Sequence, residues 1–399
     1  MYPKYDLIIF TLSRWDAPIS SPSLSLAKEF SKNNRVFYID HPYSWKDFTK
    51  LYNKPEIKAR KKALLFRKNI YTKSKESDNL TFVTPGISLP INFLPGGKFY
   101  NLLSKYNDHI IFSTIRRIIK DFNIKEFVFI NAFDPFFAIE FPSDIKPLKR
   151  VYQSMDDLSQ VAYTAKHGIK LEEAIIKAYD ITLTTSRELR RLKSQFSDKV
   201  FLHPNAADVS LFRKSADEVL PKPKEFETIN KKVIGFTGNL EERTDYELLR
   251  KIAEKHSDKI LLLVGPFGND EYKTVNLDKI PNVIFAGSKN IKDLPAYLQY
   301  MDCLIIPFKC SILTKSIYPL KINEYLAAGK PVIATHFSED IYSFKDVAYI
   351  AENHDEFINY IDIAIAENTE EKKQERIKAT LQNTWTARVD AFWKILSEN

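Results

Sequence analysis

The sequence predicts an α/β protein with two doubly wound units, and three features of the 399-residue chain point to this fold class. Short β-branched and aromatic runs alternate with helix-period segments along the whole chain. Many of these runs are apolar without a break, such as residues 260–264, which suits strands buried on both faces of a parallel sheet. A single polar stretch with two prolines divides the chain, and a length prior of about 150 residues per domain favours two or three domains.

The predicted strands fall into one group on each side of the dividing stretch. The first group is 6–10, 35–39, 80–83, 127–130, 150–153, 181–184 and 200–202, and the second is 233–237, 260–264, 283–285, 303–306 and 331–334. Between them we expect helices near 23–31, 99–121, 172–178, 186–194 and 245–255. A final helix is expected because large apolar residues from Trp385 to Leu396 recur at helical spacing.

The dividing stretch, residues 215–232, contains Pro221 and Pro223 and has no clear periodicity, so it predicts the interdomain linker. We therefore expect one Rossmann-like domain over 1–215 and a second over 216–381. The final helix, about 382–399, is expected to pack back on the first domain. Two such domains predict a ligand cleft between them.

Composition excludes several classes of protein. With 44% apolar residues, 28 Phe and 20 Tyr, the chain is neither disordered nor fibrous. Its two cysteines, Cys303 and Cys310, cannot form a disulfide framework, and no cysteine–histidine cluster has zinc spacing, so we expect no metal and a reducing compartment. An acidic start and the lack of an apolar stretch of about 18 residues predict a soluble, cytoplasmic protein.

The net charge of +8 is concentrated in one segment, because residues 46–75 hold eleven Lys and Arg against two acids. Aromatic residues interleave with these cations, which suits a peripheral contact with an anionic membrane surface. We expect lipid contact through Arg60, Lys61, Lys62 and Lys68. A solvated loop is the competing reading, and nucleic-acid binding lacks a recognised module.

The segment 313–335 carries the most chemical information. Pro319 predicts the start of a short helix, Gly329 supplies the left-handed residue that ends it, and Pro331 prevents its continuation. The helix, roughly 319–328, would present unpaired backbone N–H groups to a phosphate. Lys321 and Glu324 share one face, where a cation and a carboxylate would hold a nucleoside diphosphate and its ribose. An exposed Lys–Glu pair on an ordinary amphipathic helix is the alternative.

Residues 319–333, Pro-Leu-Lys-Ile-Asn-Glu-Tyr-Leu-Ala-Ala-Gly-Lys-Pro-Val-Ile, resemble the donor-binding signature of retaining GT-B glycosyltransferases of family four. The nearest-looking branch makes bacterial capsule, teichuronic acid and exopolysaccharide sugars. Residues 234–249 and 281–307 resemble its donor loop and base-binding region, and 204–212 resemble the element that closes its N-terminal half. Residues 13–22 resemble its acceptor-side loop, and 152–157 stand where it has a Tyr-Asp-Cys-Met-Asp-like run.

The resemblance implies a GT-B fold and transfer of a sugar from a nucleotide-diphosphosugar to a glycan or lipid-linked acceptor, with retention and without metal or other cofactor. Glu324 would bind the donor ribose. The implied donor-binding residues are Gly238, Asn239, Gly287, Ser288, Ser316, Tyr318, Leu320 and Glu324. Ser316 stands where the family often has a second Glu that contacts the donor sugar, and Ala206 replaces a family Gly.

The expected catalytic groups are two cations and one carboxylate. Arg243 follows the Gly238–Asn239 turn, where a guanidinium can meet a diphosphate, although it could also be a solvated charge beside two glutamates. With Lys321 it would stabilise the departing diphosphate in place of a metal. Asp156 ends a predicted strand and could hold a substrate hydroxyl.

The acceptor-side residues are expected to be Arg14, Trp15, Asp16, Asp134 and Asp157. Capping of the following segment is an equal reading for Asp157. None of the seven histidines shows a partner in the sequence, so no role is assigned to them, and the family's leaving phosphate would take the acceptor proton. Two other functions stay open: a nucleotide-sugar epimerase or hydrolase on the same fold, and a non-catalytic nucleotide-sugar-binding scaffold of a polysaccharide assembly complex.

Overall fold

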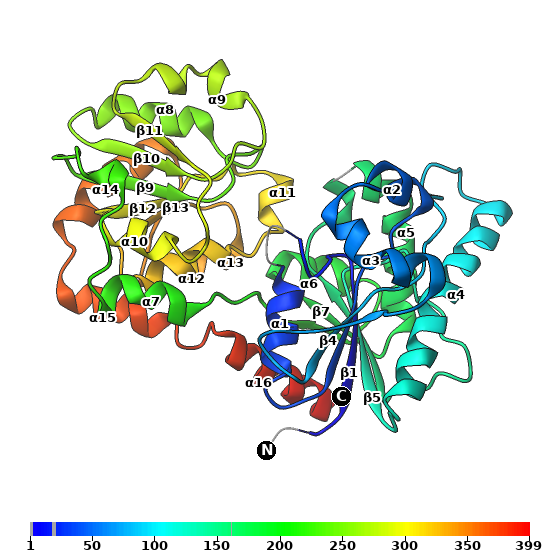
Figure 1. Ribbon diagram of the computed structural model, residues 1–399. Coiled ribbons are helices and arrows are strands. Elements are labelled where there is room, and N and C mark those ends of the chain that lie inside the picture. Colours follow the sequence, from blue (N-terminus) through cyan, green and yellow to red (C-terminus); the bar gives the residue numbers. More distant parts are fainter. Residues whose placement is uncertain (1–2, 18–20, 161) are drawn as a thin grey trace. The chain divides into compact units, whose positions relative to one another are not determined.

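The structure is a computed structural model that describes residues 3–17, 21–160 and 162–399. It divides into two compact units, each with its own sheet (Figure 1). Unit 1 comprises Met1–Pro204 and Arg388–Asn399, and unit 2 comprises Asn205–Ala387. The predicted α/β class with two parallel-sheet domains is confirmed.

The units divide after residues 204 and 387, whereas the sequence places the divisions at 215 and 381. The difference arises at α7 (Val209–Asp217), whose apolar face buries Val209 and Phe212 in the core of unit 2. The polar stretch that follows also lies on unit 2, where the backbone N–H of Leu220 donates to Gln299 Oε1 at 2.9 Å. Helix α7 and the residues up to Leu220 are therefore held on unit 2 by packing and hydrogen bonding, and they do not form a linker.

Unit 1 contains an eight-stranded sheet in the order β3-β4-β2-β1-β5-β6-β7-β8. Its strands are β1 (Asp6–Thr11), β2 (Val36–Ile39), β3 (Tyr71–Lys73), β4 (Leu80–Val83), β5 (Phe127–Ala132), β6 (Lys149–Ser154), β7 (Ile181–Thr184) and β8 (Val200–Leu202). All neighbours pair in parallel except β3, which runs antiparallel to β4. Strands β1, β2, β4 and β5 are buried along their whole length, as their unbroken apolar runs predict.

The helices of unit 1 cover both faces of this sheet. They are α1 (Pro22–Phe30), α2 (Trp45–Lys50), α3 (Pro55–Phe66), α4 (Lys98–Asp121), the short η1 (Leu158–Gln160), α5 (Ala162–Ala178), α6 (Arg187–Lys193) and α16 (Trp385–Glu398). Ser21 caps α1, since its hydroxyl accepts from the N–H of Leu24. From α16, Phe392 packs edge-on against Phe30 of α1, with ring centroids 4.9 Å apart.

Unit 2 contains a six-stranded, wholly parallel sheet in the order β11-β10-β9-β12-β13-β14. Its strands are β9 (Val233–Thr237), β10 (Ile260–Val264), β11 (Val283–Gly287), β12 (Cys303–Ile306), β13 (Val332–Thr335) and β14 (Tyr349–Ala351). The order of strands reverses between β9 and β12. In open parallel sheets, ligands bind outside the carboxyl ends of the strands at such a reversal, so this point locates the candidate site of unit 2.

The helical segments of unit 2 lie between these strands and after the last one. Besides α7 they are η2 (Lys224–Phe226), α8 (Tyr246–Lys255), α9 (Glu271–Thr274), η3 (Leu277–Lys279), α10 (Leu294–Gln299), α11 (Ile312–Lys315), α12 (Leu320–Ala327), α13 (Glu339–Tyr342), α14 (His354–Ala366) and α15 (Glu370–Ala379). None of the helices in the described part of the chain combines the length and apolar character needed to cross a bilayer.

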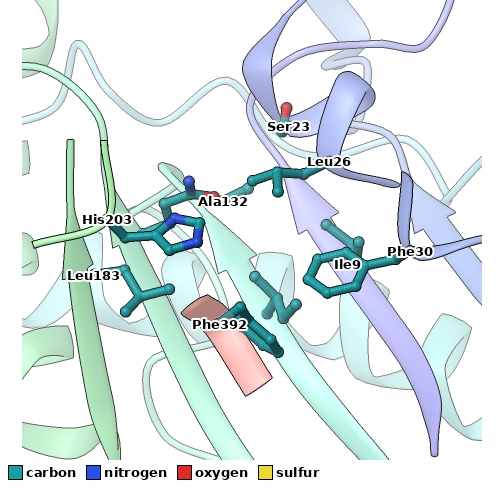
Figure 2. A pocket seen from close by; sticks show the side chains of 10 residues that line it. Ile9, Ser23, Leu26, Phe30, Ala132, Leu183, His203 and Phe392 are labelled. Carbon is teal, nitrogen blue, oxygen red and sulfur yellow. The ribbon is translucent and has the colours of Figure 1, made fainter. Parts of the chain in front are cut away.

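A small internal cavity of about 10 Å³ lies in unit 1 between the central strands and helices α1 and α16. Figure 2 shows Ile9, Phe30, His203 and Phe392 around it. His203 is buried, and its Nε2 lies 2.8 Å from the carbonyl oxygen of Arg388, which ties the end of β8 to α16. Burial lowers the pKa of His203 to about 4, so the imidazole is neutral and donates to that carbonyl.

This buried histidine predicts a loss of stability in acid. The imidazole of the unfolded chain has an ordinary pKa near 6.5, whereas the folded state has a pKa of about 4 at this residue. Between these two pH values the unfolded state binds one more proton than the folded state, and this favours unfolding. The free energy of unfolding should therefore fall by roughly 2 kcal/mol, from this group alone, between about pH 7 and about pH 4.5.

Urea unfolding of the wild type and of His203→Gln at both pH values measures this contribution as the difference between the two proteins. The exposed His109 on α4 provides the matched control variant, His109→Gln. An equal acid dependence in the wild type and in His203→Gln would contradict the assignment.

Candidate functional site

Three neighbouring strands of unit 2 end in glycines with positive φ. Gly238 (φ 141°) follows β9, Gly265 (φ 154°) follows β10, and Gly287 (φ 68°) ends β11. The N–H of Gly238 donates to Val264 O at 2.8 Å, and that of Gly265 donates to Gly287 O at 2.9 Å. A Cβ on Gly265 would lie 1.9 Å from Gly238 O. The strand ends thus form a closely packed backbone floor, which we call the glycine floor.

Helix α12 begins beside this floor. Its N-cap is Pro319, which offers no side-chain acceptor, so no side chain caps the N–H groups of the first turn. Ala328 is the C-cap and Gly329 has φ 69°, so the predicted helix and its glycine stop are confirmed, with Pro319 one position outside the helix. The hydroxyl of Tyr325 accepts from the N–H of Thr237 at 2.8 Å, which anchors α12 to the end of β9.

Lys321 extends from the first turn of α12 over the glycine floor. A Cβ on Gly238 would lie 2.1 Å from Lys321 Cε, so only glycine allows this approach. The ammonium lies 5.8 Å from the ring centres of Phe236 and Phe308. Burial, together with the charge of Arg243, lowers the pKa of Lys321 to about 8, while the charge of Glu324 acts in the opposite direction.

Glu324 lies one turn further along α12, partly buried like Lys321. Burial raises the pKa of its carboxyl, and the charge of Lys321 partly offsets this. Within the described ranges, neither side chain has an oppositely charged group within 4.0 Å. The pair is therefore not the exposed ion pair of an ordinary amphipathic helix, because both charges lack the partner that burial normally requires.

Arg243 lies in the loop after β9, next to the same aromatic ring as Lys321. Its guanidinium is 5.5 Å from the centre of Phe308, and its backbone O accepts from the N–H of Lys309 at 2.9 Å. The guanidinium also pairs with Glu241, while its Nε is buried without a hydrogen-bond partner. Arg243 therefore has the acidic neighbour that the solvated-charge alternative expects. It is also a second positive charge that acts on Lys321, as a diphosphate site requires.

The other predicted donor residues lie at the same sheet edge. Asn239 follows Gly238 and is partly exposed, and Ser288 follows β11 and is exposed. Ser316 is buried at the end of α11, and Tyr318 is buried with its hydroxyl 3.0 Å from Asn323 Nδ2. Leu320 opens α12. No group of three or more His, Cys, Asp or Glu in the described part of the chain could hold a metal ion.

The acceptor-side residues of unit 1 also follow strand ends. Arg14, Trp15 and Asp16 follow β1, and Asp134 follows β5. The guanidinium of Arg14 lies 3.6 Å from the centre of the Tyr43 ring, and its Nε donates to the carbonyl oxygen of His41 at 3.1 Å.

The two aspartates after β6 differ in their surroundings. Asp156 is exposed. Asp157 accepts from the N–H of Ser159 at 3.0 Å and contacts Gln160, so it caps η1, in agreement with the capping alternative.

One predicted lipid contact is wrong. Arg60 is only 5% exposed, and its guanidinium donates to both carboxylate oxygens of Asp16 at 2.6 and 2.8 Å and to Asp40 at 3.2 Å. The reason is its place on the inner face of α3, where Ile57 and Leu64 are also buried. Lys61, Lys62 and Lys68 are exposed.

Sequence reasoning missed the partner of His41. The sequence shows no partner for this histidine, whereas in the structure the imidazole Nδ1 lies 2.6 Å from Asp134 Oδ2. The two residues follow β2 and β5, which flank β1 in the sheet. No local motif links residues so far apart in sequence, and only the order of strands brings them together.

Comparisons with known proteins agree with this geometry. Residues 231–367 match the family model described as "Glycosyl transferases group 1". Over 186 residues the chain is 31% identical to TuaH of Bacillus subtilis (strain 168), whose name, a teichuronic acid biosynthesis glycosyltransferase, is itself provisional. The match covers 46% of this chain and 44% of TuaH, so the chain spans less than half the length of this relative.

Solved structures resemble the chain over nearly its full length. An E. coli structure described as trehalose-6-phosphate bound with UDP-2-fluoro glucose has a TM-score of 0.70 at 11% identity and covers 99% of both chains. Sucrose-phosphate synthase from Thermosynechococcus elongatus has a TM-score of 0.66 at 14% identity and covers 98% of both chains. At identities this low, the similarity shows a shared fold and says nothing about activity or substrate. Residues 231–367 are therefore similar to the group 1 glycosyl transferases, and the two parallel-sheet units have the GT-B fold.

Proposed function

We propose that the protein is a glycosyltransferase that moves a sugar from a nucleotide-diphosphosugar to a glycan or lipid-linked acceptor in cell-surface polysaccharide biosynthesis. The observation that carries the proposal is the unpaired, partly buried charge pair Lys321 and Glu324 beside the glycine floor and Arg243. The match to the group 1 family and the name of TuaH support the activity and its biological context.

Each feature of the unit 2 site matches one part of such a donor. The glycine floor has no side chains, so a diphosphate can approach the backbone closely. The uncapped N–H groups of α12 and the charges of Lys321 and Arg243 favour its negative oxygens. Glu324 presents a carboxylate one turn further on, where it can accept hydrogen bonds from the ribose hydroxyls.

The proposed chemistry is electrostatic. As the bond between sugar C1 and the phosphate oxygen breaks, negative charge grows on the diphosphate, and the two cations with the helix N-terminus stabilise that charge. Positive groups held in place before the reaction need no reorganisation when the charge develops. We propose retention of configuration and independence of metal, following the family resemblance.

The donor pair generates a mutational prediction. Lys321→Ala and Glu324→Ala should each lower kcat/KM by about 10²-fold or more, as expected when one preorganised group in the site is lost. Glu324→Ala should act mainly through weaker donor binding. The donor is first chosen by thermal shift from a panel of UDP-, GDP- and TDP-sugars, because a bound ligand raises the melting temperature.

The matched controls are Glu247→Ala and Arg250→Ala, which remove a partly exposed ion pair on α8 of the same unit. These variants should keep wild-type turnover. Wild-type turnover in Lys321→Ala or Glu324→Ala would contradict the proposed site. Tight donor binding without turnover on any acceptor would favour the non-catalytic scaffold instead.

Turnover should persist in EDTA, because Lys321 and Arg243 supply the positive charge that a divalent metal would otherwise provide. The assay is nucleoside diphosphate release before and after dialysis against EDTA. Loss of activity that Mg²⁺ or Mn²⁺ restores would overturn the metal-independent mechanism.

We also propose that unit 1 docks on anionic lipid through α3. Its outer face carries exposed Lys58, Lys61 and Lys62, and its end carries Leu65 and Phe66, the latter 67% exposed. Basic residues with exposed apolar side chains on one helix suit an anionic interface.

Reversal of the exposed charges tests this docking. The triple variant Lys61→Glu, Lys62→Glu, Lys68→Glu should lose sedimentation with phosphatidylglycerol vesicles, at ~1 kcal/mol per basic residue near the headgroups. Binding of the wild type should also fade at 1 M salt, where the Debye length is about 3 Å. The control variant Lys255→Glu, Lys279→Glu, Lys378→Glu makes the same charge change on exposed lysines of unit 2. Equal sedimentation of both triple variants would contradict docking through α3.

A further inference from the structure

An open groove of about 800 Å³ lies on unit 2 between α7, α10 and residues 218–225, and we call it the lysine groove (Figure 1). Its lining belongs to unit 2 and includes none of the residues assigned to the donor site. Ligand sites in proteins commonly have volumes of about 300–1,000 Å³, so the groove is large enough for a ligand. Its floor is apolar and consists of Leu211, Leu220, Pro221, Pro223, Pro295 and Ala296.

Hydrogen bonds fix the walls of the lysine groove. The hydroxyl of Ser215 on α7 donates to the carbonyl oxygen of Pro295 on α10 at 2.6 Å. Gln299 Nε2 donates to the carbonyl oxygen of Ser215 at 2.9 Å. The hydroxyl of Tyr300 donates to the carbonyl oxygen of Leu220, also at 2.9 Å. The two helices and the segment after α7 are therefore held together by the chain itself, and the groove is preformed, as ligand sites usually are.

The segment 218–225 is a stiff wall that carries two of the lysines. Proline fixes φ near −65°, and Pro223 has φ −64° and ψ 145°. A residue that precedes a proline is held extended, which applies to Lys222. Lys222 and Lys224 alternate with Pro221 and Pro223, and both lysines are exposed. The prolines thus place two cations on a wall that has little backbone freedom to lose when a ligand binds.

Positive charge exceeds negative charge in the lysine groove. The lining contains five lysines, Lys214, Lys222, Lys224, Lys289 and Lys292, and three acids, Glu218, Glu225 and Asp293. Glu225 is occupied by its neighbours, because Lys289 Nζ donates to Oε1 at 2.7 Å and the hydroxyl of Tyr297 donates to Oε2 at 2.8 Å. The other four lysines are exposed, and no carboxylate of the described residues lies within 4.0 Å of their ammonium groups. Four unpaired cations therefore border an apolar floor.

Two other hollows of unit 2 have balanced charge. The hollow between α8 and α14 has Lys251 and Lys255 against Glu254 and Asp355. The hollow beside β14 has three basic and three acidic side chains, which are Lys345, Lys372, Arg376, Asp346, Glu367 and Glu375. The lysine groove instead has two more basic than acidic side chains. An excess of one sign of charge along a concave surface attracts ligands of the opposite sign, so the groove favours an anion.

The residue types of the groove distinguish between kinds of anion. Protein interfaces are enriched in Arg and depleted in Lys, whereas the described lining has five lysines and no arginine. Single-stranded nucleic acid stacks its bases on exposed aromatic rings, but Tyr297 in the lining is only 5% exposed. A linear acidic polysaccharide meets each feature of the groove. It is narrow, its charges recur along the chain, and its sugar rings offer C–H groups to an apolar floor.

We propose that the lysine groove binds a linear acidic polysaccharide. The carboxylate groups of the glycan pair with the ammonium groups of the four unpaired lysines, and its sugar rings lie on the leucine and proline floor. Lysine suits such a ligand, because its long flexible stem lets the ammonium follow charges that are spaced along a chain. This binding goes beyond the proposed sugar transfer, and it can be measured without turnover.

Fluorescence anisotropy of the full chain tests this binding with a fluorescein-labelled hyaluronan oligosaccharide, a linear glycan with a carboxylate on every second sugar. The triple variant Lys222→Gln, Lys224→Gln, Lys292→Gln should weaken binding by about 10-fold or more, because three exposed ion pairs are lost together. Binding of the wild type should also fade in 1 M salt, where the Debye length is about 3 Å. The control variant Lys255→Gln, Lys279→Gln, Lys378→Gln removes the same charge from exposed lysines elsewhere on unit 2 and should keep the wild-type affinity.

Amine footprinting locates the contact without any substitution. The wild type is acetylated with and without the hyaluronan oligosaccharide, and the modified peptides are compared by mass spectrometry. Acetylation of the four unpaired groove lysines should fall when the glycan is bound, whereas acetylation of Lys255 and Lys279 should not change. Equal protection of both sets, or of neither, contradicts binding in the groove.

Competition with other polymers separates the possible occupants. Dextran, a neutral glycan, should not displace the labelled oligosaccharide, and poly-L-glutamate should displace it less than unlabelled hyaluronan does at equal charge. Displacement by dextran overturns the role of charge, and equal displacement by poly-L-glutamate overturns the assignment to a polysaccharide. Equal binding by the two triple variants, or no binding by the wild type, overturns the site itself.

A thermal shift with nucleotide-diphosphosugars, measured on the same samples, keeps this test separate from the proposed function. The shift should be the same in the wild type and in the groove variant, because the groove contains no donor-site residue. A wild type that binds hyaluronan but no nucleotide-diphosphosugar counts against the proposed transfer and leaves the groove in place.

Discussion

Parallel pairing obliges successive strands to end at the same edge of a sheet, and both candidate sites depend on this constraint. In unit 2, β9, β10 and β11 end side by side, so three glycines meet in one floor beneath Lys321. In unit 1, β2, β1 and β5 end side by side, so His41 meets Asp134 across the turn that carries Arg14. The residues of each set are far apart in the sequence. They are adjacent in the structure because the loops that follow parallel strands all lie at the same edge of the sheet.

Buried charge is treated differently at two places in the fold. Arg60 is surrounded by Asp16 and Asp40, and Lys193 pairs with Glu172 at 2.6 Å, so these cations are compensated within the chain. Lys321 and Glu324 are partly buried without such partners, and their pKa values shift toward the neutral forms. Burial of an uncompensated charge costs stability. A ligand that brings negative oxygens to Lys321 and hydroxyl donors to Glu324 would recover part of that cost as binding free energy, which is why the uncompensated pair is the one we propose as a binding site.

The sequence alone predicts most of the fold, since unbroken apolar runs and helix caps are local signals. Pro319 and Gly329 bracket α12 within one residue, and the run at 260–264 matches β10. The sequence does not predict β3, because Tyr71 is only partly buried, Thr72 and Lys73 are exposed, and the three residues lack a strand pattern. It also places Arg60 outside, because a basic segment does not show which of its cations faces inward. The partner of His41 depends on strand order, which no local pattern contains.

The path of the chain has a consequence for how the protein is made. Phe392 and Trp393 of α16 complete the apolar surface around Phe30 of α1, yet the ribosome adds them only after the whole of unit 2. During synthesis, the apolar surface around Phe30 therefore stays exposed until α16 has been made. Unit 2, which is a single continuous range of the chain, can fold before that point. The N-terminal half of the chain is made first but finishes its core last.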